Sequence, residues 1–294
     1  MKKYLSLSLI ALFLFSCSGD DATPVTAENP EPENPQTSIE GILVQTTTKM
    51  YENGSVFRIE TTDYENGRPI TESTYNSSST LQYTAKFNYN TAGLLESNEF
   101  YNPDNFIYNT TSFDYDEQQR LLKITQESNT ENISDLIYNF TYNSDNTISG
   151  TGGGMNKTYV LNENGFIIKQ IDISSIKTFA LDEVHHMPLS YVYSSSGPFS
   201  ETASYVYDDV HNPELLNLAN LYGTSKTNAL LSNIDIYEAP LYASTRYLIK
   251  KTVTSEFGQT IFEDIYTWND LGLPTKKKSY RNDELLRVTD YIYQ

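Results

Sequence analysis

The residue with the most specific chemistry in this 294-residue chain is its single cysteine, Cys17. It follows a basic start, Lys2 and Lys3, and an almost wholly apolar run over residues 4–16. A positive segment, then a short apolar segment, then small residues predict a secretory signal peptide over residues 1–16. The apolar run falls short of the ~20 residues that a membrane-spanning helix needs. Because the chain has no second cysteine, its fold gains nothing from disulfides.

The residues around this thiol carry a first resemblance. The segment Leu14-Phe15-Ser16-Cys17 resembles the lipobox of bacterial lipoproteins, which implies that Cys17 is lipidated and becomes the first residue of the mature protein. Ser18, Gly19, Asp20 and Asp21 resemble the acidic signal that exports lipoproteins of Bacteroidota-type bacteria to the outer face of the outer membrane. The alternative is that these polar residues only lift the folded part off the bilayer.

The next segment has the composition of a tether. Residues 22–37 contain four prolines and no apolar periodicity, so they cannot bury enough surface to offset the entropy of ordering. We therefore expect a lipidated cysteine and a disordered tether over residues 17–38, followed by a single folded domain over residues 39–294. That length is enough for a hydrophobic core without disulfides.

The charge of the chain limits its partners. A formal net charge of −18 repels the phosphate backbone of nucleic acids, whose binding needs clustered lysine and arginine. We therefore expect no nucleic-acid partner. The expected contact with a membrane is the lipid anchor at Cys17.

The 24 tyrosines follow a regular pattern, aromatic–x–aromatic–Asn/Asp. Its clearest copies begin at Phe87, Phe113, Phe140, Tyr205 and Tyr266, and the first three are spaced by about 26 residues. Such a period indicates an array of one supersecondary unit.

Each repeat predicts a β-hairpin. Alternate aromatic residues lie on one face of a strand, so Leu81, Tyr83, Ala85, Phe87 and Tyr89 share a face. The following Asn or Asp can start a turn by bonding its own backbone, and a glycine often follows three residues later. The prediction is an all-β fold of consecutive antiparallel β-hairpins, curled into a barrel-like or long twisted sheet. A β-sandwich is the alternative, and the hairpins over residues 51–75 are expected at an edge.

One repeat carries a second resemblance. The segment Tyr115-Asp116-Glu117-Gln118-Gln119-Arg120-Leu121 resembles the tyrosine–aspartate repeat of RHS proteins, with Gln119 at the position of the consensus glycine. The other copies keep the aromatic residue and the glycine but lose the arginine. Over residues 40–294 the chain is similar to RHS-repeat-like lipoproteins of unknown function in Bacteroidota, which implies a β-rich extracellular domain and no particular activity.

One segment departs from the strand pattern. Asn212 can cap a helix, Pro213 suits its first position, and Gly223 can end it. We expect a short helix over residues 213–222 that plugs one end of the curled sheet, with a mobile lid as the alternative.

Catalytic and metal-binding motifs find little support. Residues 150–158 resemble a phosphate loop, but Asn156 replaces the required glycine and a strand pattern follows, so a hairpin tip is expected. His185 and His186 would point to opposite faces of a strand, and with His211 they are the only histidines. Asp182, Asp208 and Asp209 could bind calcium, but no calcium-loop spacing is present. We expect no catalytic residues, no metal site and no cofactor.

These features predict a protein without catalytic activity on the outer membrane or cell surface. Aromatic residues on a sheet can stack on sugars, so we expect a module that binds a glycan or a protein. The alternatives are a structural or adhesive scaffold and a carbohydrate-active enzyme. Exposed rings on a concave face would favour binding, whereas internal rings would favour a scaffold.

Overall fold

The computed structural model describes residues 41–129, 134–183, 188–208 and 247–294. These residues form eighteen β-strands, and each strand pairs antiparallel with the strands before and after it in the chain. The first nine strands are β1 (Leu43–Glu52), β2 (Ser55–Glu65), β3 (Arg68–Asn76), β4 (Leu81–Tyr89), β5 (Leu95–Tyr101), β6 (Ile107–Tyr115), β7 (Leu121–Ser128), β8 (Leu136–Tyr142) and β9 (Thr147–Gly152). The others are β10 (Met155–Leu161), β11 (Ile167–Asp172), β12 (Ser175–Leu181), β13 (Pro188–Ser195), β14 (Ser200–Tyr207), β15 (Leu248–Ser255), β16 (Gly258–Trp268), β17 (Pro274–Arg281) and β18 (Glu284–Tyr293).

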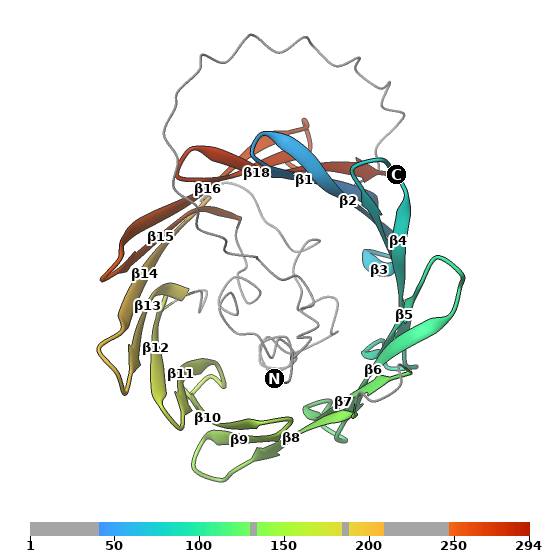
Figure 1. Cartoon of the computed structure of the whole chain (residues 1–294). Helices are drawn as coiled ribbons and strands as arrows, with labels where there is room; N and C mark the ends of the chain where they lie inside the picture. Colours follow the sequence, from blue (N-terminus) through green and yellow to red (C-terminus); the bar gives the residue numbers. More distant parts are fainter. Residues whose placement is uncertain (1–40, 130–133, 184–187, 209–246) are drawn as a thin grey trace, which may run out of the picture.

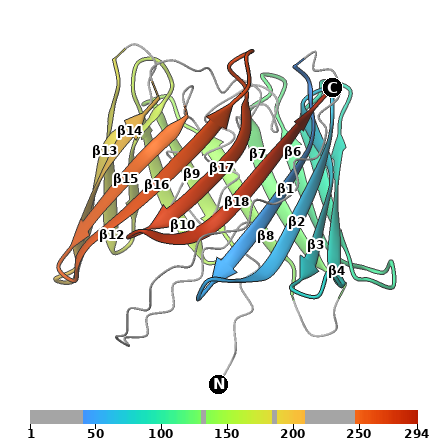
Figure 2. The ribbon, with the colours of Figure 1, turned by 90° about the horizontal axis from the view of Figure 1, so that it is seen from above.

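The first and last strands close the sheet into a barrel. β1 pairs with β18 from Leu43 opposite Tyr293 to Met50 opposite Arg287. Next to this ladder, Ile42 and Gln294 exchange backbone hydrogen bonds of 3.1 and 2.8 Å. Figure 1 shows the closed ring, and Figure 2 shows its strands tilted against the barrel axis, as closure requires.

The barrel confirms the predicted all-β fold of consecutive hairpins. The expected edge over residues 51–75 is wrong, because β2 pairs with both β1 and β3 and closure leaves no edge there. The sandwich alternative is also wrong, since all the strands belong to one sheet. The predicted helix over residues 213–222 lies outside the described residues. In the described part of the chain, no helix has the length and apolar character needed to cross a membrane.

The two faces of the sheet differ sharply in burial. On β14, Ala203, Tyr205 and Tyr207 are buried, whereas Thr202, Ser204 and Val206, which alternate with them, are exposed. The register carries this division from strand to strand, because Ala203 lies opposite Tyr191 on one side and Val253 on the other. We call the buried side the aromatic face. Buried rings on this face include Phe113, Tyr138, Phe140, Tyr159, Tyr191, Tyr205 and Tyr293.

The aromatic face is the inner wall of the barrel. Side chains converge on the concave side of a curved sheet and diverge on its convex side. Only the concave side can therefore bring rings such as Tyr159 and Tyr191 to 2 % exposure through contacts with their neighbours. The predicted shared face of Leu81, Tyr83, Ala85, Phe87 and Tyr89 belongs to this wall, since Ala85 lies opposite buried Phe100.

The outer face carries cross-strand pairs of charged or hydrogen-bonding residues, together with exposed apolar residues such as Val192, Val206 and Ile265. Lys250 and Glu263 face each other on β15 and β16 with 2.9 Å between Nζ and Oε1. The same kind of direct opposition occurs in three more pairs: Lys276–Asp290 at 3.4 Å, Lys123–Asp114 at 3.7 Å, and Gln45–Asp63, a 2.7 Å hydrogen bond.

The predicted Asn and Asp turns are confirmed at atomic detail. The Oδ1 of Asn90 accepts hydrogen bonds of 3.0 Å from the backbone N–H groups of Ala92 and Leu94. The same two-bond arrangement recurs at Asn76, Asp116, Asn162 and Asn269. The third turn residue has a positive φ, which glycine adopts at Gly93 and which Gln119 adopts at 62° in the copy that lacks the glycine.

The tyrosines that end the strands tie strands of neighbouring hairpins together. The hydroxyl of Tyr89 donates to the carbonyl of Pro69, the second residue of β3, at 2.8 Å. Equivalent bonds, each to a residue 18 to 20 positions earlier, join Tyr115 to Leu95, Tyr207 to Pro188, Tyr266 to Leu248 and Tyr293 to Pro274. We call these bonds tyrosine clasps. Tyr89, Tyr115, Tyr207 and Tyr293 are each the second aromatic residue of their copy, and each makes a hydrogen bond that phenylalanine could not make.

A pair of tyrosine-to-phenylalanine substitutions tests the clasps. Tyr293→Phe removes a 2.7 Å bond to a buried carbonyl and should lower the free energy of unfolding by about 1–2 kcal/mol. Tyr142 is the matched control, because its buried hydroxyl has no hydrogen-bond partner. Tyr142→Phe should leave stability unchanged or raise it slightly. Urea unfolding of both variants measures the difference, and equal losses would contradict a specific role for the clasps.

Candidate functional site

The site residues predicted from the sequence lie outside the described part of the chain. Nothing is therefore known of the placement of Cys17, Ser18, Gly19, Asp20 and Asp21, and their roles stay predictions. The same holds for His185, His186, His211 and Asp209. Among the residues that the structure describes, no three His, Cys, Asp or Glu side chains gather closely enough to hold a metal ion.

The glycine-rich segment is a hairpin tip, as predicted. Gly153 and Gly154 form the turn between β9 and β10, both with positive φ. A strand follows Met155, so no helix N-terminus faces the loop as a phosphate site would require.

The predicted stacking surface is largely filled by its own rings. On β12 to β14, Phe179 packs edge-on to Tyr191 at 6.4 Å between ring centroids, and Tyr191 lies 6.2 Å from Tyr205. Burial of these rings leaves little of their faces for a sugar. This part of the inner wall therefore serves as the hydrophobic core.

Charged side chains lie among these rings. Their position on the inner face was not predicted from the sequence. Lys177 is 7 % exposed, and its ammonium lies 4.0 Å from the centroid of Tyr191. Lys251 is 8 % exposed and lies 5.4 Å from the centroid of Phe262. Cation–π attraction offsets part of the cost of placing each ammonium inside the barrel.

One charged cluster spans β2 to β4. The Arg58 guanidinium lies 2.6 Å from an Oε1 of Glu60 and donates a short hydrogen bond to the Tyr83 hydroxyl. Burial, followed by repulsion from Glu60, raises the pKa of Glu72 to about 7 against the lowering influence of Arg58. Glu72 thus titrates near neutral pH.

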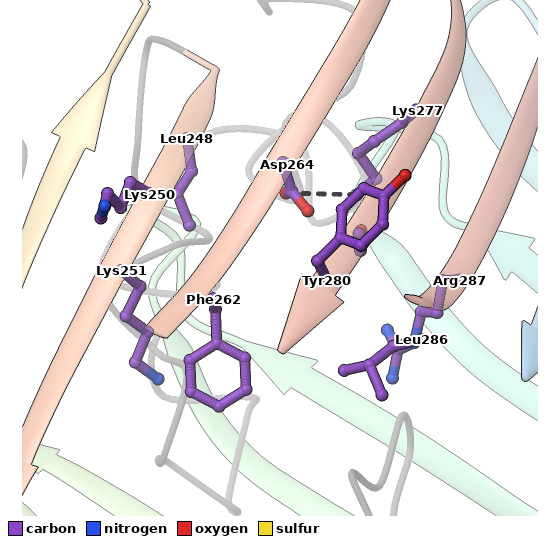
Figure 3. Close-up of a pocket in the computed structure, with 10 residues that line it drawn as sticks. Leu248, Lys250, Lys251, Phe262, Asp264, Lys277, Tyr280, Leu286 and Arg287 are labelled. Atoms are coloured by element: carbon purple, nitrogen blue, oxygen red, sulfur yellow. Dashed lines mark ion pairs between the residues drawn. The ribbon is translucent and has the colours of Figure 1, made fainter. Parts of the chain in front are cut away.

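A second charged group lies on β15 to β18 and lines a shallow pocket (Figure 3). Lys251 lies opposite Phe262, Asp264 opposite Ser279, and Ser279 opposite Arg287, so these side chains share the inner face. Lys277 also lies on this face, with its Nζ 3.8 Å from Oδ2 of Asp264. The cavity volume is about 130 Å³, below the roughly 300–1,000 Å³ of pockets that enclose drug-sized ligands.

Aromatic rings flank this pocket. Tyr266 follows Asp264 by two residues on β16 and stacks on Trp268, with 5.1 Å between ring centroids. Tyr247 contacts both rings at 5.2 and 4.9 Å. Trp268, the only tryptophan of the chain, therefore lies in an aromatic cluster beside the pocket strands.

The basic pocket had a weak signal in the sequence. Lys276, Lys277 and Lys278 are consecutive in a strongly acidic chain, and Lys250 precedes Lys251. Of these lysines, only Lys251 and Lys277 lie on the inner face. They can be identified only from the register between strands, which the sequence alone does not give.

Comparisons with known proteins give remote likenesses. No protein-family model matches the chain, and no curated protein matches it. A solved porin-like protein from Bacteroides uniformis has a TM-score of 0.45 and 12% identity, over 88% of this chain and 99% of the other. A porin-like protein from Bacteroides vulgatus has a TM-score of 0.44 and 10% identity, over 86% and 98%.

A third solved structure, TcdB2-TccC3-TEV, has a TM-score of 0.29 and 8% identity. The match covers 85% of this chain and 15% of the other. At these TM-scores the likenesses carry no argument about the function of this chain.

The Glu72 carboxyl gives the barrel a pH dependence of stability. Its pKa in the folded protein is about 7, against an ordinary value of 4.5, so unfolding releases a proton between these values. The contribution of protonated Glu72 to the free energy of unfolding is present in full below pH 4.5 and is lost as the pH rises through 7. From pH 5 to pH 8 the unsubstituted protein should lose unfolding free energy. The Glu72→Gln variant should lose about 1–2 kcal/mol less over the same range.

Glu96→Gln is the control for this experiment, because Glu96 is an exposed carboxyl on β5. Its pH profile should match that of the unsubstituted protein. Thermal unfolding at a series of pH values measures both variants. An unchanged slope in Glu72→Gln would show that Glu72 does not hold the proton.

Proposed function

We propose that the protein is a lipoprotein anchored through Cys17 whose barrel stands in water outside the outer membrane and recognises a ligand without catalysing a reaction. The lipobox-like segment and the apolar run before it support the anchor. The segment Ser18 to Asp21, which contains two aspartates, supports export to the extracellular side. The repeated hairpins support an extracellular domain of the RHS-repeat-like kind.

The observation that carries this proposal is the polar outer wall. The ion pairs Lys250–Glu263, Lys276–Asp290 and Lys123–Asp114 lie on the outward side of paired strands. In a membrane-spanning barrel this side forms an apolar band, and a lysine at mid-membrane costs roughly 2–4 kcal/mol. Exposed apolar side chains such as Val206 and Ile265 also lie on this side. The ion pairs among them suit water, so attachment to the membrane would depend on the lipid.

A structural or adhesive scaffold is the second candidate function. The burial of rings such as Tyr159 and Tyr191 favours it, because these rings are used for packing. Recognition then depends on surfaces where charge or aromatic groups remain accessible. The pocket on β15 to β18 is such a surface.

Replacement of the anchor tests the proposal. Cys17→Ser should move the protein from the membrane fraction to the soluble fraction, with an unchanged melting temperature, because the barrel itself needs no lipid. Cell fractionation followed by thermal unfolding of the released protein measures both properties. Retention of Cys17→Ser in the membrane fraction after carbonate washing would contradict the proposal and favour an inserted barrel.

Two controls separate anchoring from export. Ser18→Ala keeps the cysteine and should stay in the membrane fraction. The Asp20→Ala, Asp21→Ala double variant should also stay there but lose its sensitivity to protease added to intact cells. Unchanged protease sensitivity would remove the export role of the acidic residues and leave the anchor untouched.

A further inference from the structure

We propose that the inner-face pocket on β15 to β18 binds the carboxylate or sulfate group of an acidic sugar, with Arg287 and Lys277 as the residues that hold the anion. This assignment rests on the proposed function of ligand recognition and names the ligand class. Its evidence is the local excess of cations, an arginine without an acidic partner, and the apolar groups beside it.

The pocket reverses the charge balance of the chain. The protein has a net charge of −18, yet among the described residues on the inner face of this pocket Lys277 and Arg287 lie beside one carboxylate, Asp264. Lys250 also lines the pocket, but Glu263 on the outer face pairs with it. A local positive surface on an acidic protein attracts anions against the field of the whole molecule.

Arg287 is the strongest candidate for binding an anion. It is partly buried, and its guanidinium makes no ion pair or hydrogen bond with another residue in the described part of the chain. Met50 lies opposite it on β1 and Ser279 opposite it on β17, so neither cross-strand neighbour carries a compensating charge. A guanidinium presents paired donors that match a carboxylate or sulfate.

Lys277 can supply a second donor. Its Nζ lies 3.8 Å from Asp264, a separation longer than that of a hydrogen bond, so the ammonium keeps donors for another acceptor. Figure 3 shows Lys277 on β17 and Arg287 on β18, on strands that pair with each other. The anion would therefore lie between these two strands.

The rest of the lining favours a sugar over a bare inorganic anion. Phe262, Leu248 and Leu286 give the pocket apolar surface, and Tyr280 adds a phenol ring (Figure 3). Aromatic and aliphatic surfaces pack against the C–H groups of a pyranose ring. The volume of about 130 Å³ suits one charged sugar residue at the end of a chain and not several residues.

Titration of the full chain in mild detergent tests the site. The probes are digalacturonate, a galactose disaccharide without charge, and inorganic sulfate. Calorimetry supplies the dissociation constants, and the emission of Trp268 near the pocket supplies a second readout. Digalacturonate should bind at least tenfold more tightly than the neutral disaccharide, and the difference should shrink as salt is raised from 20 to 150 mM, roughly as screening predicts.

Two variants with the same loss of charge locate the binding. Arg287→Ala should weaken binding of digalacturonate at least tenfold, whereas Lys278→Ala should not change it. Lys278 is next to Lys277 on β17, but on the outer face. Arg287 has no acidic partner to lose, so its variant should keep the melting temperature.

Each result bears on the site. Equal weakening by Lys278→Ala, or no weakening by Arg287→Ala, would overturn it. Binding of sulfate as tight as that of digalacturonate would show a site for small anions and would overturn the sugar assignment. If digalacturonate fails to bind but Cys17→Ser still releases a folded soluble barrel, the site is wrong and the proposed water-facing barrel stands.

Discussion

The hydrogen bonds between β1 and β18 close the sheet into a ring, and this closure gives the two faces of every strand different surroundings. Inside the ring the side chains converge, so large rings on neighbouring strands pack against one another. Outside they diverge, so polar groups and cross-strand ion pairs meet water. Closure also satisfies the backbone of what would otherwise be two edge strands. Leu43, Tyr291 and Tyr293 form a small buried cluster at this seam, supported by Tyr64 and Leu273.

Much of this arrangement could be predicted from the sequence, because the repeat acts locally. Alternation of aromatic residues identifies the inner face of β4 and β8, and Asn90 and Asp116 identify the turns. Closure could not be predicted, since β1 and β18 lie about 240 residues apart and each could equally have been an edge. The expected edge over residues 51–75 failed for this reason.

The charged part of the inner wall could not be predicted for a related reason. Consecutive lysines such as Lys276, Lys277 and Lys278 alternate between water and the inner wall, and only the register shows which one is inside. Neither Glu60 near Glu72 nor Lys251 opposite Phe262 has a sequence signature, because each pair comes from different strands. The role of the clasp tyrosines was likewise hidden, since their acceptors are backbone carbonyls about 20 residues away.

The barrel is acidic as a whole, but its inner pocket on β15 to β18 is basic. We propose that the acidic surface contacts water and that the basic pocket binds an anion. In the proposed function, the net negative charge and the outer ion pairs would keep the barrel in water. Lys277 and Arg287 would then act as a selective site, because the net charge of the chain repels anions elsewhere. The buried rings of β8 to β14 pack as a core, and the proposed recognition would fall to β15 to β18.

The most direct test of the account is the orientation of adjacent residues on β14. Ala203 is 4 % exposed and Thr202 is exposed, so the account predicts opposite results for a thiol at each position. In vesicle-bound protein whose Cys17 is acylated, Thr202→Cys should react quickly with a polar fluorescent maleimide, and iodide in the water should quench the label. Ala203→Cys should react only after unfolding. Quenching of the label at position 202 by brominated lipids, or rapid reaction at position 203, would contradict an aromatic inner wall and a water-facing outer one.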